Sequence, residues 1–158
     1  MGTIMNYTFV SKNREETVRL GEIIAPLFCR GDVVLLEGDL GAGKTTLVGG
    51  VAKALRIKDE VISPTFNIMK CYFKGDMPLY HIDAYRLENQ NIELGLDEYI
   101  EGDGVCFVEW PQFIQPLLPD EYLEIVLEHI DENQRRITLK SNSPHFDEMV
   151  KKVEEILK

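Results

Sequence analysis

Residues 33–46 read VVLLEGDLGAGKTT, a continuous apolar run that leads into a glycine-rich turn. Four consecutive large aliphatic residues are typical of a parallel strand that is covered on both faces. Gly38 and Gly43 bracket the spacing G-x-x-x-x-G-K-T, and a helical pattern follows from about Lys44 to Leu55. The glycines let backbone amides curl around an anion, and the dipole of the following helix points at the same anion. The stretch therefore predicts a strand, a phosphate-binding loop and a helix, in that order.

The positions of this loop have distinct expected roles toward a nucleotide. The Lys44 ammonium is expected to reach the β- and γ-phosphates, and the Thr45 hydroxyl is expected to bind Mg²⁺. The residues expected to hold the nucleotide are Asp39, Leu40, Gly41, Ala42, Gly43, Lys44, Thr45 and Thr46. The guanine-reading tetrapeptide N-K-x-D does not occur in the sequence, which favours ATP as the nucleotide.

The whole chain predicts an α/β fold of the P-loop NTPase kind, with a mostly parallel central sheet, antiparallel edge strands and flanking helices. Further strands are expected at Tyr7–Val10, Phe66–Phe73, Leu79–Asp83 and Val105–Glu109. The alternating residues 123–128 and Arg136–Lys140 predict an antiparallel hairpin at a sheet edge. Helices are expected at Glu15–Phe28, capped by Ser11 or Asn13, and after the cap Ser143-Pro144, with a loop at Pro111–Pro119 between the last strands.

The length and net charge of the chain limit the classes of protein to which it can belong. With 158 residues, 44% of them hydrophobic, residues 1–158 are expected to form one domain. No apolar stretch approaches the roughly 18–20 residues of a membrane span, and the N-terminus does not fit a signal peptide, so a cytoplasmic location is expected. The net charge is −10, from 27 acidic and 17 basic residues, and no lysine- or arginine-rich run occurs. This balance argues against strong direct binding of nucleic acid.

The cysteines and histidines are widely scattered along the sequence. Their positions are Cys29, Cys71, Cys106, His81, His129 and His145. No C-x-x-C pair and no zinc-motif spacing is present, so the sequence alone predicts neither a disulfide framework nor a metal centre built from these residues.

Two acids and one threonine are candidates for chemistry at the phosphate loop. Asp83 and Glu109 each end a predicted strand, where catalytic carboxylates of α/β proteins usually lie near Mg²⁺ or the attacking water. A strand-end acid is equally often a solvated loop residue, but two of them beside a phosphate loop favour a functional role. Thr65, in Ser63-Pro64-Thr65, is a candidate for sensing the γ-phosphate through Mg²⁺, although the same tripeptide is ordinary loop chemistry.

Four segments together resemble one family. They are GDLGAGKTT (38–46), SPTF (63–66), YHIDAYRL (80–87) and FVEW (107–110). In this order they are similar to the TsaE family, small bacterial ATPases of tRNA threonylcarbamoyladenosine synthesis. The resemblance covers roughly Ser11 to Trp110, and the segment 80–87 is its most discriminating part. The C-terminal hairpin and helix match the family in kind only.

The resemblance implies an activity, cofactors and partners. TsaE proteins bind ATP and Mg²⁺, hydrolyse ATP and associate with a TsaB–TsaD pair. Carried onto this chain, Lys44, Thr45 and the loop amides hold phosphate and Mg²⁺, Glu109 is the leading catalytic or Mg²⁺-proximal acid, Asp83 is second, and Thr65 is a further Mg²⁺-site residue. Two alternatives remain, a nucleotide-dependent assembly switch with incidental hydrolysis and a small-molecule kinase. The kinase is disfavoured because no arginine-rich insert for a lid is present.

Overall fold

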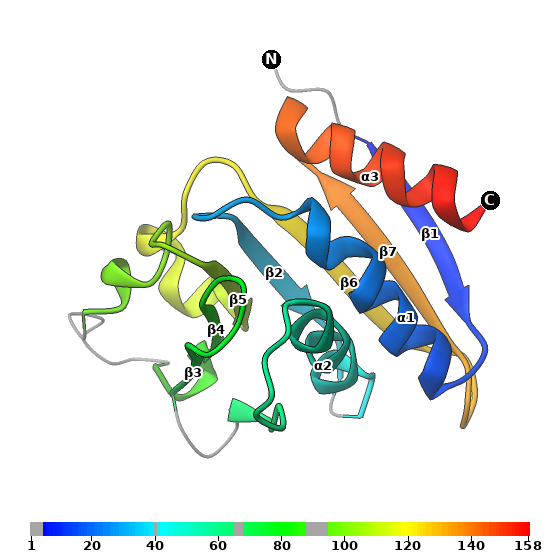
Figure 1. Ribbon diagram of the computed structural model, residues 1–158, viewed down its shortest axis with the longest axis horizontal. Coiled ribbons are helices and arrows are strands. Elements are labelled where there is room, and N and C mark those ends of the chain that lie inside the picture. Colours follow the sequence, from blue (N-terminus) through cyan, green and yellow to red (C-terminus); the bar gives the residue numbers. More distant parts are fainter. Residues whose placement is uncertain (1–4, 40, 65–67, 88–94) are drawn as a thin grey trace.

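The central element is a seven-stranded sheet, seen in a computed structural model that describes residues 5–39, 41–64, 68–87 and 95–158. The strand order is β1-β7-β6-β2-β5-β4-β3 (Figure 1). The strands are β1 (Asn6–Ser11), β2 (Val33–Glu37), β3 (Met69–Tyr72), β4 (Leu79–Asp83), β5 (Val105–Glu109), β6 (Leu123–His129) and β7 (Arg135–Ser141). β6, β2, β5 and β4 are parallel neighbours, and the remaining pairings are antiparallel. The predicted fold class is confirmed.

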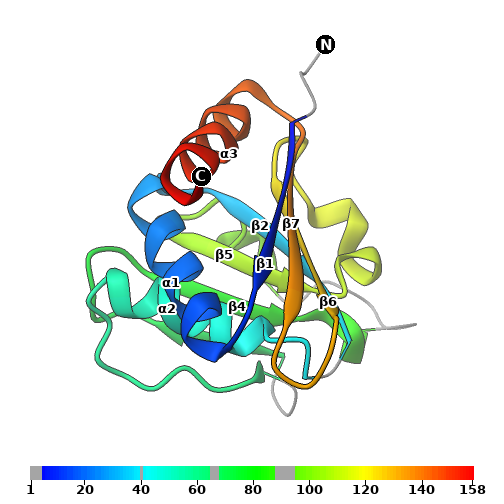
Figure 2. The ribbon, with the colours of Figure 1, turned by 90° about the vertical axis from the view of Figure 1, so that its right-hand side faces the viewer.

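The α-helices of the described chain lie together on one face of this sheet (Figure 2). They are α1 (Arg14–Ile24), α2 (Lys44–Ala54) and α3 (Pro144–Leu157), and they enclose the larger core cluster with side chains such as Leu36 and Phe107. The other face is covered beside β4 and β5 by 3₁₀ segments at Ala84–Leu87, Leu96–Glu98 and Pro111–Leu117. Within the described residues, no helix is long and apolar enough to cross a membrane.

The first helix begins and ends for local reasons. Asn13 is its N-cap, because its side-chain oxygen accepts a hydrogen bond from the Glu16 amide at 2.9 Å. The Glu16 carboxylate in turn accepts from the Lys12 amide, one residue before the N-cap, at 3.0 Å, so a second backbone amide at the start of the helix is satisfied. The helix was expected to reach Phe28 but ends at Ile24 and tightens to a 3₁₀ segment, because Pro26 has no N–H to continue the α-helical ladder.

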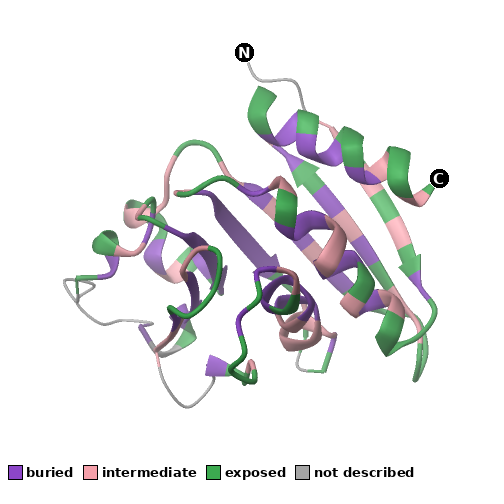
Figure 3. Ribbon diagram, in the orientation of Figure 1, coloured by how far each residue is buried: buried purple, intermediate pink, exposed green. Residues whose placement is uncertain are grey.

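The predicted hairpin exists as β6 and β7, but its placement at a sheet edge is wrong. β6 pairs in parallel with β2 in the sheet interior, and β1 adds outside β7 as the edge strand. The edge position was predicted from the alternation of apolar and polar residues in this hairpin. That alternation has a different cause, because helices cover only one face of these strands. Burial alternates along β1 and β7, whereas β2 is buried at each residue from Val33 to Leu36 (Figure 3).

Two adjacent glycines of α2 provide a test of helix packing. A Cβ atom at Gly50 would collide with the carbonyl oxygen of Val18 in α1, whereas a Cβ at Gly49 would meet nothing within 4 Å. We therefore expect Gly50→Ala to destabilise the protein by about 1–3 kcal/mol through forced separation of the helices. Gly49→Ala should instead stabilise it by up to about 1 kcal/mol, because alanine is the better helix former. Denaturant unfolding of both variants measures this; equal shifts in the same direction would contradict the packing described.

Candidate functional site

The predicted phosphate loop connects the end of β2 to the start of α2. Gly43 is the N-cap of α2 with φ 103°, a conformation that side-chain-bearing residues rarely adopt. A Cβ at Gly38 would lie 2.7 Å from the carbonyl oxygen of Leu127, so this turn also requires glycine. Backbone geometry thus explains why both bracketing positions of the motif are glycine. The N-terminus of α2 faces the loop, as an anion site requires.

The two predicted acids end neighbouring parallel strands. Asp83 is the last residue of β4 and Glu109 the last of β5, and the two are direct register partners. Glu109 is in turn the register partner of Leu36 in β2, two residues before Gly38 of the loop. Because parallel strands end at the same edge of a sheet, both carboxylates lie beside Lys44 at the start of α2.

A chain of close polar contacts joins the loop to the acids. The Lys44 ammonium lies 3.0 Å from Oε1 of Glu109, and Nε2 of His81 lies 2.6 Å from Oε2. All three side chains are largely buried, with exposed fractions of 12% for Lys44, 8% for Glu109 and 0% for His81. A carboxylate can only accept, so Nε2 of His81 donates, and the buried Nδ1 has no hydrogen-bond partner in the described part of the chain.

The environments of the two acids move their pKa values in opposite directions. Burial alone would raise the pKa of Glu109, but the hydrogen bond and charge of His81 and the charge of Lys44 outweigh it, so the pKa is lowered. The pKa of Asp83 is raised, chiefly by burial and further by the nearby Glu109 charge, against a hydrogen bond from the Tyr85 amide at 3.1 Å. Opposite shifts in adjacent carboxylates are characteristic of functional sites.

Lys44, Asp83 and Glu109 all line one cavity of about 560 Å³. Its lining residues are Gly41, Gly43, Lys44, Thr45, Thr46, Ser63, Asp83, Tyr85, Glu109 and Trp110. Trp110 has φ 56°, a left-handed conformation that turns the chain sharply after Glu109. The centroids of the Trp110 and Tyr85 rings lie 5.1 Å apart. The strained backbone at Trp110 thus directs an aromatic wall into the cavity.

Asp39 and Ala42, which were also predicted to bind nucleotide, are not among the residues that line this cavity. Asp39 lines an adjoining cavity of about 530 Å³ that also includes Lys44 and Trp110. Ala42 is buried, and its amide donates to the Asp39 carbonyl at 3.0 Å. Leu40 and Thr65 lie outside the described residues.

Three residues of the site were not singled out from the sequence. His81 was named only in a family motif and among the scattered histidines, yet it precedes Asp83 by two strand positions, so alternation along β4 places both on one face. Tyr85 lines the cavity. Arg135, at the start of β7, donates from Nη2 to the Gly41 carbonyl at 3.2 Å. No local pattern predicts this last contact, because it depends on β6 running parallel to β2.

Comparisons with known proteins agree with this architecture. A family model described as "Threonylcarbamoyl adenosine biosynthesis protein TsaE" matches residues 11–137. A TsaE protein of Bacillus subtilis is 47% identical over 85% of each chain, and one of Nostoc is 43% identical over 78% of this chain and 79% of that one. A crystal structure of Bacillus subtilis YdiB superimposes with a TM-score of 0.85 and 37% identity over the full length of both chains. The chain therefore belongs to the TsaE family of threonylcarbamoyl adenosine biosynthesis proteins.

Proposed function

We propose that this chain binds ATP with Mg²⁺ in the cavity beside the phosphate loop and hydrolyses it, as the ATP-consuming component of the threonylcarbamoyladenosine machinery. The observation that carries the proposal is the buried contact chain from Lys44 through Glu109 to His81 at the mouth of the loop. A loop lysine within reach of a strand-end acid joins the group that binds phosphate to the group that can act on water.

The residues present fit a magnesium-bound triphosphate. Thr45, Asp83 and Glu109 supply oxygen donors to the same cavity, and oxygen is the ligand that Mg²⁺ takes. When bound, Mg²⁺ would neutralise charge on the β- and γ-phosphates. Lys44 would hold the phosphates in the same region, and the amino end of α2 would add its dipole.

Glu109 is the acid to which we assign water orientation. Its lowered pKa keeps it ionised at neutral pH, so it is available as an acceptor. Phosphate oxygens compete with its carboxylate for the Lys44 ammonium, and loss of that partner removes one of the charges that lower its pKa. The carboxylate would then be a better acceptor for the water proton, while His81 continues to hold its second oxygen. Asp83 is assigned the supporting role near Mg²⁺.

We further propose that the site is completed by a TsaB–TsaD pair. None of the described residues that line the cavity is an arginine, although an arginine often stabilises the transition state of phosphoryl transfer. The exposed side chains of Tyr85 and Trp110 stand at the cavity, where a partner can contact them. The net charge of −10 is consistent with tRNA being held by another component.

A product assay tests the proposal against its alternatives. The purified chain is incubated with Mg²⁺ and ATP, with and without an added nucleoside, and both inorganic phosphate and phosphorylated products are measured. We expect phosphate alone. Transfer of phosphate to the nucleoside would establish a kinase, and nucleotide-dependent complex formation without any phosphate release would establish a switch; either result would replace the ATPase proposal.

A further inference from the structure

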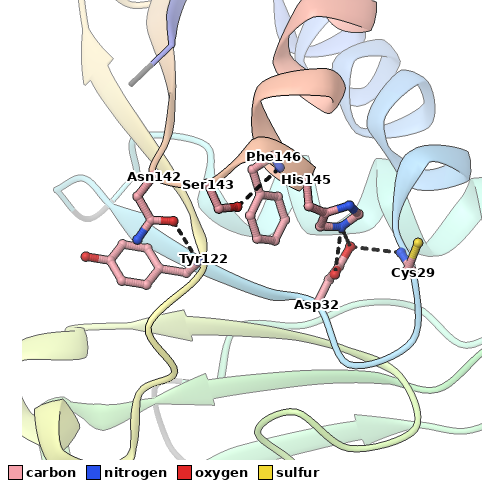
Figure 4. Close-up of polar contacts among 7 residues, drawn as sticks. All are labelled: Cys29, Asp32, Tyr122, Asn142, Ser143, His145 and Phe146. Carbon is pink, nitrogen blue, oxygen red and sulfur yellow. Dashed lines mark hydrogen bonds and ion pairs between the residues drawn. The ribbon is translucent and has the colours of Figure 1, made fainter. Parts of the chain in front are cut away.

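Cys29, Asp32 and His145 form a cluster of three side chains, each of a type that can bind a metal ion, away from the phosphate loop. One ligand atom from each of the three lies within 4.8 Å of the other two (Figure 4). Cys29 and Asp32 precede β2, whereas His145 is 113 residues away from Asp32 and lies in the first turn of α3. The phosphate loop follows the other end of β2, so this cluster and the candidate ATP site lie at opposite ends of one strand.

The turn before β2 fixes two of the three side chains. The Cys29 amide donates to Oδ2 of Asp32 at 2.8 Å, and the Asp32 amide donates to the Cys29 carbonyl at 3.1 Å. Gly31 between them has φ 93° and donates to the Gly104 carbonyl at 2.8 Å, which ties the turn to the segment before β5. The thiol and the carboxylate are therefore presented by a short, hydrogen-bonded backbone.

Hydrogen bonds also fix the backbone at the start of α3, which carries the third side chain, His145. Ser143 is the N-cap and accepts from the Phe146 amide at 3.4 Å, and Asn142 accepts from the Tyr122 amide at 2.9 Å. The His145 ring packs against Phe146, with centroids 4.7 Å apart. Its Nε2 lies 3.0 Å from each carboxylate oxygen of Asp32.

From this arrangement we infer that Cys29, Asp32 and His145 form a binding site for Zn²⁺ or a similar divalent transition ion. Bond lengths of about 2.0–2.3 Å in a tetrahedral zinc site place ligand atoms roughly 3.3–3.8 Å apart, so small side-chain rotations bring these three atoms to the required spacing. A thiolate, an imidazole and a carboxylate together match zinc, whereas Mg²⁺ takes oxygen ligands. Water fills the fourth position.

Binding exchanges protons for the ion. The thiol of Cys29 releases its proton to solvent on forming the sulfur–metal bond, and His145 gives up the Nε2 proton that it donates to Asp32, binds through that nitrogen and carries its remaining proton on Nδ1. The Asp32 carboxylate changes its partner, from the imidazole to the metal. The ion thereby joins the segment before β2 to the start of α3, and it should stabilise the fold because the unfolded chain lacks the preformed site.

Cobalt(II) is a suitable probe, because thiolate coordination gives a charge-transfer absorption band. The reduced full-length protein is titrated with Co²⁺ in excess Mg²⁺ and without nucleotide. We expect one equivalent to produce the band and Zn²⁺ to displace it, with a rise in Tm. Cys29→Ser should abolish the band, and His145→Gln should weaken binding by about tenfold or more. Both positions are exposed, so neither change threatens folding.

Matched controls change a cysteine or histidine elsewhere in the fold. Cys71→Ser alters a half-buried thiol on β3, and His129→Gln alters an exposed histidine at the end of β6; both should keep the band and the rise in Tm. Absence of the band in the wild-type protein, or its persistence in Cys29→Ser, would overturn the proposal. The cluster would then be only a hydrogen-bonded pair of His145 and Asp32 beside a thiol.

Discussion

Replacement of Lys44 by alanine is expected to weaken ATP binding and to lower phosphate release by at least about 100-fold, which corresponds to roughly 2.7 kcal/mol of transition-state stabilisation. The ammonium is the cation that contacts Glu109 inside the candidate cavity, and we assign it the β- and γ-phosphates. Its loss removes a binding group and a charge stabiliser together. Titration with a fluorescent ATP analogue and a phosphate-release assay measure the two effects.

Lys53→Ala is the matched control for this change. Lys53 lies on the same helix, but its side chain is 71% exposed, and among the described residues its ion pair is with Glu22, at 3.3 Å. An exposed pair of this kind contributes little, so the control should retain both binding and turnover. Thermal unfolding of both variants verifies that each is folded. Unchanged affinity and unchanged hydrolysis in Lys44→Ala would refute the assignment of the phosphate loop.

Glu109→Gln is expected to separate ATP binding from hydrolysis. The amide keeps the shape of the side chain but removes its charge, so hydrolysis should fall at least about tenfold, or roughly 1.4 kcal/mol. ATP should bind at least as tightly as in the wild-type protein, because the Lys44 ammonium no longer has a competing carboxylate 3.0 Å away. Single-turnover hydrolysis and equilibrium binding distinguish the two effects.

Asp83→Asn provides the comparison and should reduce hydrolysis equally or less. The two changes should shift stability at neutral pH in opposite directions. The lowered pKa of Glu109 means that its ionised form stabilises the fold above its ordinary pKa, an effect lost as pH falls through the lowered value. The raised pKa of Asp83 means that its ionised form costs stability at neutral pH, so asparagine should not destabilise. If Asp83→Asn abolished turnover while Glu109→Gln kept the wild-type rate, our ranking of the acids would be wrong.

Local patterns in the sequence were sufficient to predict the elements that build the candidate site. The spacing of Gly38, Gly43 and Lys44 predicted the loop, and the strands ending at Asp83 and Glu109 have the bounds the structure gives. These features depend on neighbouring residues: strand ends, turn glycines and the start of a helix. The roles of Lys44, Thr45, Asp83 and Glu109 toward ATP and Mg²⁺ stay predictions, as does the role of Thr65.

Local sequence patterns could not predict the features that depend on pairing between distant segments. The hairpin of β6 and β7 was predicted, but the pairing of β6 with β2 and the addition of β1 outside β7 were not. The same placement brings Arg135 to Gly41, a contact between residues 94 apart in sequence. The cluster of Cys29, Asp32 and His145 was missed for the same reason, since only the fold brings α3 to the start of β2.

Steady-state phosphate release, measured as a TsaB–TsaD pair is titrated into the purified chain with saturating Mg²⁺ and ATP, tests the central claim most directly. We expect slow release by the chain alone and a rise of at least about tenfold at saturating partner, because a partner group can complete the transition-state site. The Glu109→Gln variant should bind the pair but show no such rise. Fast turnover by the isolated chain, unchanged at any partner concentration, would contradict the account and indicate an independent enzyme.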